Sequence, residues 1–342
     1  MRFVKMAERA SLKRTYSLVN RVAAFSTFFI LASCGSGSEK SEVSSTKNIN
    51  VPIVWQTSDL PESLSGFSIS DEAPVQILIG IGGEVRLIDV DGAPVAQNGP
   101  YGAAAFGSGV EATIEDAQLR MFPAISASND ELTLYTYGAG LVAPIELELN
   151  PGLEDKIKGL CAAPANDGSA LLQTAHWTAL DPATLVLGEI RNEDGAISYQ
   201  RGATIPYEKY ITSCDIDGEY VATGGGFGLA IQKVGEEPTM INAPGVPTHV
   251  ALQADEESAF AIMTLSGGKV MASNLDGQMA SINFAPGLSS HPLEEAGALA
   301  VSSVGTVGGL PNGFVAIENQ KGDSTQIIYS DLGLIKEALS SD

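Results

Sequence analysis

The stretch ITSCDIDGEYVATGGGFGLAIQKV, residues 211–234, carries the pattern that decides the fold. A polar Asp-Gly step follows Cys214, and two short apolar runs then flank the glycines Gly224–Gly226. Short runs rich in Val, Ile and Tyr, bounded by Gly and Asp, are typical of β-strands joined by tight turns. We therefore expect two strands here, a turn at Asp217-Gly218, and a close strand crossing at the glycines.

The same arrangement recurs along most of the chain, at irregular spacings of roughly 40 to 60 residues. Many short strands with Gly and Asp at the turns predict a sandwich, a barrel or a propeller, and the rhythm of strand pairs favours a propeller. Helical periodicity is confined to residues 332–339. The clearest pairs are VQILIG with EVRLIDV (75–80, 84–90), FPAISAS with ELTLYTYG (122–128, 131–138), and SAFAIMTL with KVMASNL (258–265, 269–275).

Residues 1–33 have the composition of an export signal, with six basic residues and an apolar run from Val22 to Ala32. That run is too short to span a bilayer as a helix. It ends in Leu-Ala-Ser-Cys, which resembles a bacterial lipoprotein signal, so we expect lipid attachment at Cys34. The Ser-rich segment 34–50 is expected to be a flexible tether, and residues 51–342 the folded domain.

The net charge of the chain and the residue that follows Cys34 both bear on where in the cell the protein is located. The chain carries 41 acidic against 19 basic Lys and Arg residues, a formal net charge of −22. So acidic a surface argues against nucleic acid as a partner and does not attract anionic lipid. Position 35 is Gly rather than the Asp of inner-membrane lipoproteins. The expectation is a lipid-anchored protein of the cell envelope, on the outer membrane and facing the periplasm if the host is Gram-negative.

Two cysteines, Cys161 and Cys214, remain beyond the signal. An exported protein meets an oxidising compartment, where cysteines pair, so we expect a disulfide between them. Two buried free thiols are the alternative. The gel mobility or melting temperature of the protein should respond to reductant only in the first case.

Familiar catalytic motifs are missing from the sequence. It has no GxSxG elbow and no HExxH pair, and the glycines at 224–226 are not followed by the Lys and Ser/Thr of a phosphate-binding loop. DVDG at 89–92 and DIDG at 215–218 lack the later ligands of a calcium loop. Asp-Gly pairs beside strands are more often hairpin turns, which is the interpretation we favour.

Six fragments, in order, resemble the β-propeller phytases, which are six-bladed, calcium-dependent enzymes that release phosphate from inositol phosphates. The resemblance implies a six-bladed, all-β propeller over most of residues 76–332. The fragments are QILIGIGGEVRLIDVDGAPV (76–95), PAISASNDELTLYTYG (123–138), IKGLC (157–161), SCDIDGEYVATGGGFGLAI (213–231), SAFAIMTLSGGKVMASNLDGQ (258–278) and GLPNGFVAIENQKGDSTQIIYSDL (309–332).

Few of the catalytic acids that the resemblance implies have counterparts in this sequence. Thr212 stands where the resemblance implies a Glu, and Thr223–Gly225 replace an acid pair. The Asp-rich entry motif is missing from 60–74, while Asp217 matches an acid and is the one candidate calcium ligand. Calcium needs six to eight oxygen ligands. The ligand-binding candidates are Lys158, His176, Arg201 and His249.

These observations lead to a phytase-like lipoprotein that is non-catalytic or weakly active and binds a ligand or partner protein at the mouth of the propeller channel. The alternative is an active calcium-dependent phosphomonoesterase acting on inositol phosphates. A third hypothesis is a scaffold subunit of a membrane complex.

Overall fold

The computed structural model describes residues 46–70, 74–95, 101–114, 116–137, 145–146, 156–165, 170–193, 195–288, 290–305, 309–322 and 324–340. Contacts divide the chain into units 1–43 and 44–342, and the described residues all belong to the second. The expected signal, residues 1–33, and the lipidated Cys34 lie outside the described residues.

The described chain is all-β with one short C-terminal helix, as the sequence predicts. Its strands are β1 (Lys47–Gln56), β2 (Gly66–Ile69), β3 (Ile77–Ile81), β4 (Glu84–Ile88), β5 (Tyr101–Phe106), β6 (Val110–Ile114), β7 (Ala117–Ser126), β8 (Leu132–Tyr137), β9 (Ile145–Glu146), β10 (Ile157–Pro164), β11 (Leu172–Thr178), β12 (Thr184–Glu193), β13 (Ala196–Pro206), β14 (Ile211–Asp217), β15 (Tyr220–Gly225), β16 (Gly228–Lys233), β17 (Thr239–Ile241), β18 (Pro247–Ala254), β19 (Ala259–Leu265), β20 (Val270–Asn274), β21 (Met279–Ala285), β22 (Glu295–Ser302), β23 (Phe314–Lys321) and β24 (Ser324–Asp331). The helix α1 spans Leu332–Ser340, where the sequence predicts it.

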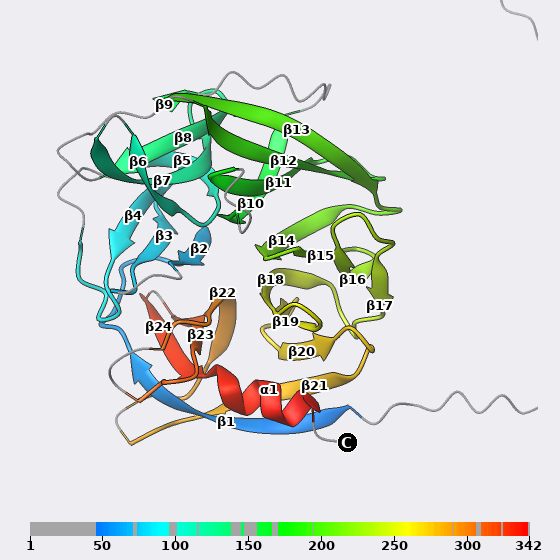
Figure 1. The fold of residues 1–342 in the computed structure, drawn as a ribbon. Helices are drawn as coiled ribbons and strands as arrows, with labels where there is room; N and C mark the ends of the chain where they lie inside the picture. The colour runs from blue at the N-terminus through cyan, green and yellow to red at the C-terminus, as the bar shows by residue number, and fades with distance from the viewer. Residues whose placement is uncertain are drawn as a thin grey trace, which may run out of the picture. The chain divides into compact units, whose positions relative to one another are not determined.

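The strands form sheets, antiparallel except where β1 pairs with β21, that are set side by side around a common centre in a β-propeller-like arrangement (Figure 1). Strands β10–β13 and β14–β17 each make a four-stranded sheet in sequence order. The first strand of each sheet, such as β10, β14, β18 or β22, lies nearest the centre (Figure 1). Side chains at the inner ends of the sheets therefore meet in one place.

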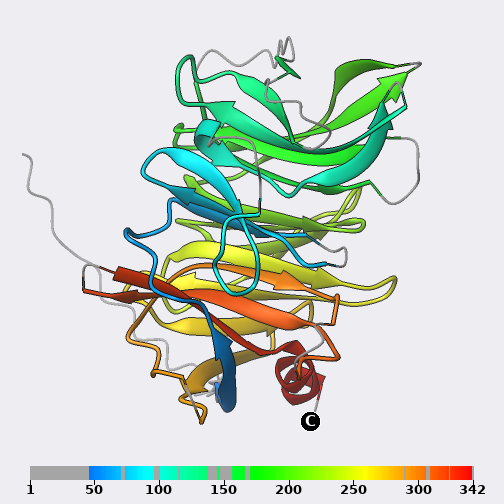
Figure 2. The same cartoon turned by 90° about the vertical axis from the view of Figure 1, so that its left-hand side faces the viewer.

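Two strands are shared between neighbouring sheets. In β1, residues Lys47–Pro52 pair in parallel with β21, and residues 53–56 pair antiparallel with β24, with a register shift between Ile53 and Trp55. In β5, Tyr101 and Gly102 pair with β4, and the residues from Ala103 onward pair with β7. Figure 2 shows blue β1 beside the red and orange strands of the C-terminal end. Strand β1 begins at Lys47, inside the segment 34–50 that was expected to be a tether.

Apolar side chains fill the space between neighbouring sheets. Ala175 and Leu185 of one sheet pack with Ile216 and Val221 of the next, and all four are buried. Strand β14 alternates between buried and half-buried residues, but β10 has buried residues on both faces, because both of its faces contact other sheets. This explains why several strands lack the polar–apolar alternation of a half-exposed sheet.

The glycines of the opening stretch have the predicted role. A Cβ on Gly224 would lie 2.8 Å from Val250 Cγ2 and 2.9 Å from Pro247 Cβ, so β15 approaches β18 at a distance that only glycine permits. Gly218 has φ +60° at the expected turn. The turn at Asp89 is also confirmed, since its carboxylate accepts hydrogen bonds from the N–H groups of Asp91 and Ala93.

Candidate functional site: the central cavity

A cavity of about 240 Å³ lies where the innermost strands meet. Most of its wall is made by residues of six strands, β2, β5, β10, β14, β18 and β22, and Trp177 of β11 and the connections that follow β5 and β22 also contribute. A concave site at which many elements converge is the usual place for a ligand. The cavity is therefore the candidate site.

Bulges occur near the start of five of the strands that line the cavity. The pairing register shifts between Ile157 and Gly159 in β10, Ile211 and Ser213 in β14, and Pro247 and His249 in β18, and similar shifts occur in β5 and β22. An extra residue in one strand redirects its side chain. The residues set apart in this way include Lys158, Thr212 and Thr248, and all three line the cavity.

The charged side chains of the wall are unevenly distributed. Lys158 lies at the start of β10, whereas Asp215 and Asp217 lie in the last part of β14. These three, with His249, are the ionisable side chains among the described lining residues apart from the paired cysteines. Lys158 is exposed, and its charge acts on Asp130 outside the wall, whose carboxylate is ion-paired with Lys156. The cavity thus has one basic end.

The two aspartates hold neighbouring sheets together. Asp215 Oδ2 accepts from the Leu252 N–H at 2.7 Å, and Asp217 Oδ2 accepts from the Ala254 N–H at 2.7 Å. Ser213 Oγ accepts from the Val250 N–H at 3.1 Å. Partners are 37 residues apart in each case, so β14 and β18 run in parallel. We call Ser213, Asp215 and Asp217 the acceptor ladder.

The acceptor ladder changes the interpretation of Asp217. Burial raises the pKa of its carboxyl, and the hydrogen bond from the Ala254 N–H offsets part of that rise. Its partner atoms are backbone and Gln253 amide donors, as expected for a structural acceptor. Among the described residues, no three His, Cys, Asp or Glu side chains gather closely enough to hold a metal ion. Calcium takes six to eight oxygen ligands, whereas the groups around Asp217 in the described structure are hydrogen-bond donors.

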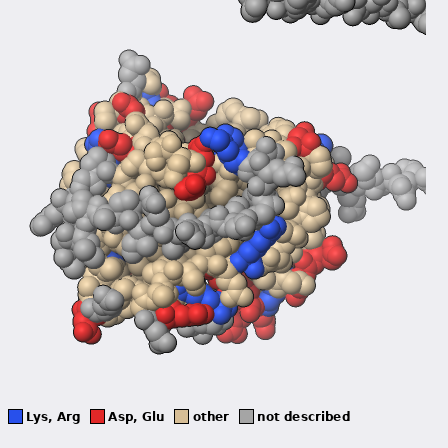
Figure 3. All heavy atoms as spheres, turned by 90° about the horizontal axis from the view of Figure 1, so that it is seen from above, with Lys and Arg blue, Asp and Glu red and all other residues tan. Residues whose placement is uncertain are grey.

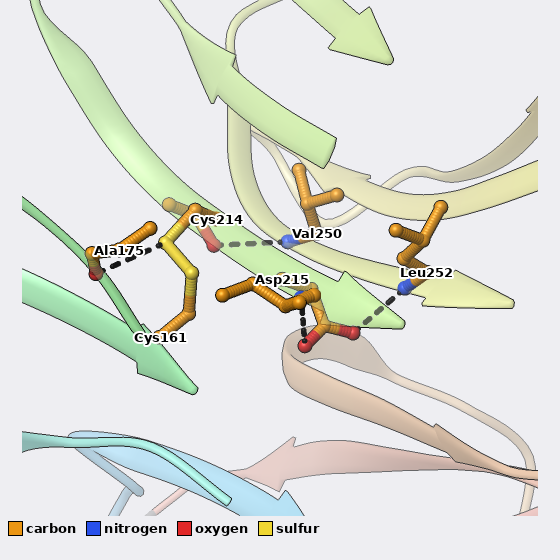
Figure 4. Close-up of a disulfide and its surroundings, with 8 residues drawn as sticks. Cys161, Ala175, Cys214, Asp215, Val250 and Leu252 are labelled. Carbon is orange, nitrogen blue, oxygen red and sulfur yellow. Dashed lines mark hydrogen bonds between the residues drawn. A yellow bond between two sulfur atoms is a disulfide. The ribbon is translucent and has the colours of Figure 1, made fainter. Parts of the chain in front are cut away.

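The predicted disulfide between Cys161 and Cys214 is confirmed. It joins β10 to β14, with 5.7 Å between the two Cα atoms, and both residues lie on the cavity wall (Figure 4). In Figure 4 the disulfide lies on one side of β14 and the Asp215–Leu252 hydrogen bond on the other. Strand β14 is thus fixed to each neighbour.

His176 and Arg201 are not on the cavity wall, so the predicted ligand-binding set is not assembled in one place. His176 lies in β11 and is fully buried, and burial, with a smaller effect of Arg201, lowers the pKa of its imidazole to about 4. Arg201 lies in β13, the outermost strand of the same sheet, and is exposed. A lone histidine or arginine carries no information about strand order within a sheet, so the sequence could not separate these from Lys158.

His249, by contrast, does line the cavity. Burial lowers the pKa of its imidazole, and its Nδ1 atom is buried without a hydrogen-bond partner among the described residues. It is therefore neutral at pH 7, and Lys158 supplies the full positive charge of the wall.

Aromatic side chains of the cavity were missed by the sequence analysis. Phe67 and Phe106 line one part of it and are half-buried, and Trp177 of β11 reaches the wall beside Lys158. A Cβ on Gly159 would lie 1.9 Å from the Trp177 ring, so the indole packs directly on the backbone next to Lys158. A Gly after a lysine in a predicted inner strand is a weak signal of such packing.

A buried acid, Glu318, was also missed. Its side chain is fully buried in β23, and it accepts hydrogen bonds from the N–H groups of Leu64 at 2.7 Å and Ala298 at 2.8 Å. Ala298 lies at the register shift of β22, where Gly297 leaves room for the carboxylate. Leu64 lies just before β2, so Glu318 joins the last sheet to the first.

The surface adds little to the site. On the face shown in Figure 3, basic side chains are separated from one another by acidic and uncharged ones. No helix in the described part of the chain has both the length and the apolar character needed to cross a membrane.

Comparisons with known proteins give a limited result. No protein-family model matches the chain, and no curated protein matches it. Among solved structures, BBS1N in complex with ARL6DN, soaked with mercury, is similar with a TM-score of 0.45 and 11% identity, over 80% of this chain and 79% of that one. The lead-soaked form of that complex has a TM-score of 0.45 and 13% identity, over 78% and 77%.

Proposed function

We propose that this chain is a six-bladed, phytase-like β-propeller that binds a small ligand in its central cavity without hydrolysing it. Six innermost strands on the cavity wall support this blade count, with β1 taken to complete the last blade and β5 to be shared by the first two. An experimental structure with five or seven innermost strands would contradict the blade count.

One observation carries the functional proposal: the acids on the cavity wall are Asp215 and Asp217, and both are engaged by backbone N–H groups of β18. A calcium-dependent phosphatase needs several carboxylates free to hold the metal and offset the charge of the phosphate. The cavity instead offers one lysine, aromatic rings and small side chains, which suits binding.

The direct test is phosphate release from inositol hexakisphosphate with the purified protein and added calcium. We expect no release above that of a protein-free control, with or without chelator. Calcium-dependent release that a chelator abolishes would overturn the proposal and support the phosphomonoesterase.

The proposal includes the envelope location that the sequence predicts, with lipid on Cys34 as the anchor. Metabolic labelling with a fatty-acid analogue should mark the protein, and Cys34→Ser should remove both the label and membrane association. Labelling that persists in Cys34→Ser would contradict the anchor.

A further inference from the structure

We propose that the ligand of the central cavity is a small organic monocarboxylate whose anionic group binds at Lys158 and whose apolar body lies among the aromatic rings. This inference rests on the proposed function and specifies the class of ligand.

The charge of the wall limits the charge of the ligand. Lys158 is exposed and lines the cavity, and its charge also acts on Asp130, whose carboxylate forms its ion pair with Lys156, while neutral His249 adds no charge. Asp215 and Asp217, in the last part of β14, repel an anion from that part of the wall. One ammonium group balances one negative charge, so a polyphosphate would remain uncompensated in a protein of net charge −22.

The donors favour a carboxylate. Trp177 packs on Gly159, the residue next to Lys158, and its indole N–H has no hydrogen-bond partner among the described residues. The hydroxyl protons of Thr212 and Thr248 are already donated to the carbonyl oxygens of Pro247 and Thr264. The Lys158 ammonium is the charged donor of the wall, the indole N–H is a second donor, and wall hydroxyls such as Ser65 and Ser303 can add to them; a carboxylate has two acceptor oxygens to receive such donors.

The remainder of the wall favours a small apolar body. Phe67 and Phe106 are half-buried on the wall, and small side chains such as Ala104 and Ala162 also line it. The volume of about 240 Å³ is below the range of about 300–1,000 Å³ that is typical of sites for drug-sized ligands. A ring with one carboxylate group fits this description.

The test compares acids with their uncharged amides. Benzoate and indole-3-acetate, with benzamide and indole-3-acetamide, are titrated calorimetrically into the full-length protein at pH 7. At least one acid should bind at least tenfold more tightly than its amide. In Lys158→Met that preference should disappear, whereas in Lys209→Met, which changes an exposed lysine away from the cavity wall, it should persist.

A second measurement reports on the cavity itself. The chain has two tryptophans, so in Trp55→Phe the fluorescence comes from Trp177 alone. Binding of the acid should change that fluorescence, and circular dichroism should show that each variant is folded. Because Lys158 and Trp55 are exposed, neither substitution removes a buried contact.

Several outcomes overturn the ligand class. They are equal binding of acid and amide, an acid preference that survives in Lys158→Met, and no binding of either acid at millimolar concentration. Tighter Lys158-dependent binding of inositol hexakisphosphate would also overturn it, while leaving the proposed cavity binding in place. Calcium-dependent phosphate release would instead overturn the proposed function.

Discussion

Strand β14 is joined to its two neighbours by different chemistry. On one side the Cys161–Cys214 disulfide links it covalently to β10, and on the other the acceptor ladder of Ser213, Asp215 and Asp217 links it to β18. The covalent link constrains the unfolded chain, whereas the ladder satisfies donors only in the folded state. The difference shows that acidic residues in a predicted site can serve structure as fully as a disulfide does.

The largest loss of stability is expected at Glu318, a fully buried carboxylate that also accepts hydrogen bonds from backbone N–H groups. Glu318→Ala leaves the buried N–H groups of Leu64 and Ala298 without their acceptor. Removing one partner of a buried charged interaction costs about 3–5 kcal/mol. We expect the free energy of unfolding, measured in urea, to fall by about 5 kcal/mol, and the melting temperature to fall clearly. Glu318→Gln retains one acceptor and should lose less. Equal stability of the Ala variant and the parent protein would contradict the role of Glu318 in closing the ring of sheets.

Removing the Cys161–Cys214 disulfide should lower the free energy of unfolding by nearly as much. The disulfide joins residues 53 apart, and the chain-entropy model assigns about 4 kcal/mol to a loop of that size. The double variant Cys161→Ala/Cys214→Ala should therefore unfold at a lower urea concentration, and reductant should lower the stability of the parent protein but not of the variant. A reductant effect of the same size on both proteins would sink this prediction.

On its other side, β10 packs against the preceding sheet, and in the described part of the chain neither a disulfide nor the acceptor ladder links the two there. Buried His176 lies opposite Leu160 in the sheet, on the face that packs against Ile125 and Leu132. Its pKa falls from 6.5 to about 4 because of burial. The unfolded chain therefore takes up a proton before the folded protein does, and stability should fall as pH drops from about 6.5 to about 4, by about 3 kcal/mol.

Urea unfolding across that pH range measures this loss, and His176→Gln is the control because it cannot take up a proton. The pH dependence of the variant should be weaker than that of the parent protein. Parallel pH profiles for the two proteins would show that His176 does not contribute.

The smallest loss of stability is expected at the acceptor ladder. Asp217→Ala leaves the Ala254 N–H without its acceptor and should cost about 1–2 kcal/mol. Asp217→Asn retains an acceptor oxygen and removes a charge that burial disfavours, so it should be near neutral. Urea unfolding of the two variants side by side measures the difference. If Asn were as costly as Ala, the negative charge rather than the hydrogen bond would be what Asp217 contributes.

Sequence patterns predicted the parts of the fold that depend on local chemistry. The paired strands β3 and β4, the helix α1, the close approach at Gly224 and the disulfide all follow from short runs, glycines and the expected compartment. The same patterns did not predict β1, because its partners β21 and β24 are remote in sequence. The Ser- and Asn-rich segment in which β1 begins therefore resembled a tether.

The site was less predictable for a geometrical reason. Which residues meet at the centre depends on strand order within each sheet and on bulges, and neither is visible in composition. Lys158 and His249 line the cavity, whereas buried His176 and outer-strand Arg201 do not, and the sequence could not separate the two pairs. Glu318 was not proposed at all, because an acid inside an apolar strand reveals its partners only in three dimensions.

The shared strand β1 also has a consequence for the order of folding. Its partners β21 and β24 lie more than 200 residues later in the chain, as the pairing of Lys47 with Ala280 illustrates. Pairing at such separation is slow, because loop-closure entropy is paid before the contacts form. During synthesis β1 must therefore wait, unpaired at both edges, until almost the whole domain has emerged. The proposed export would therefore carry the chain across the membrane before its ring of sheets can close.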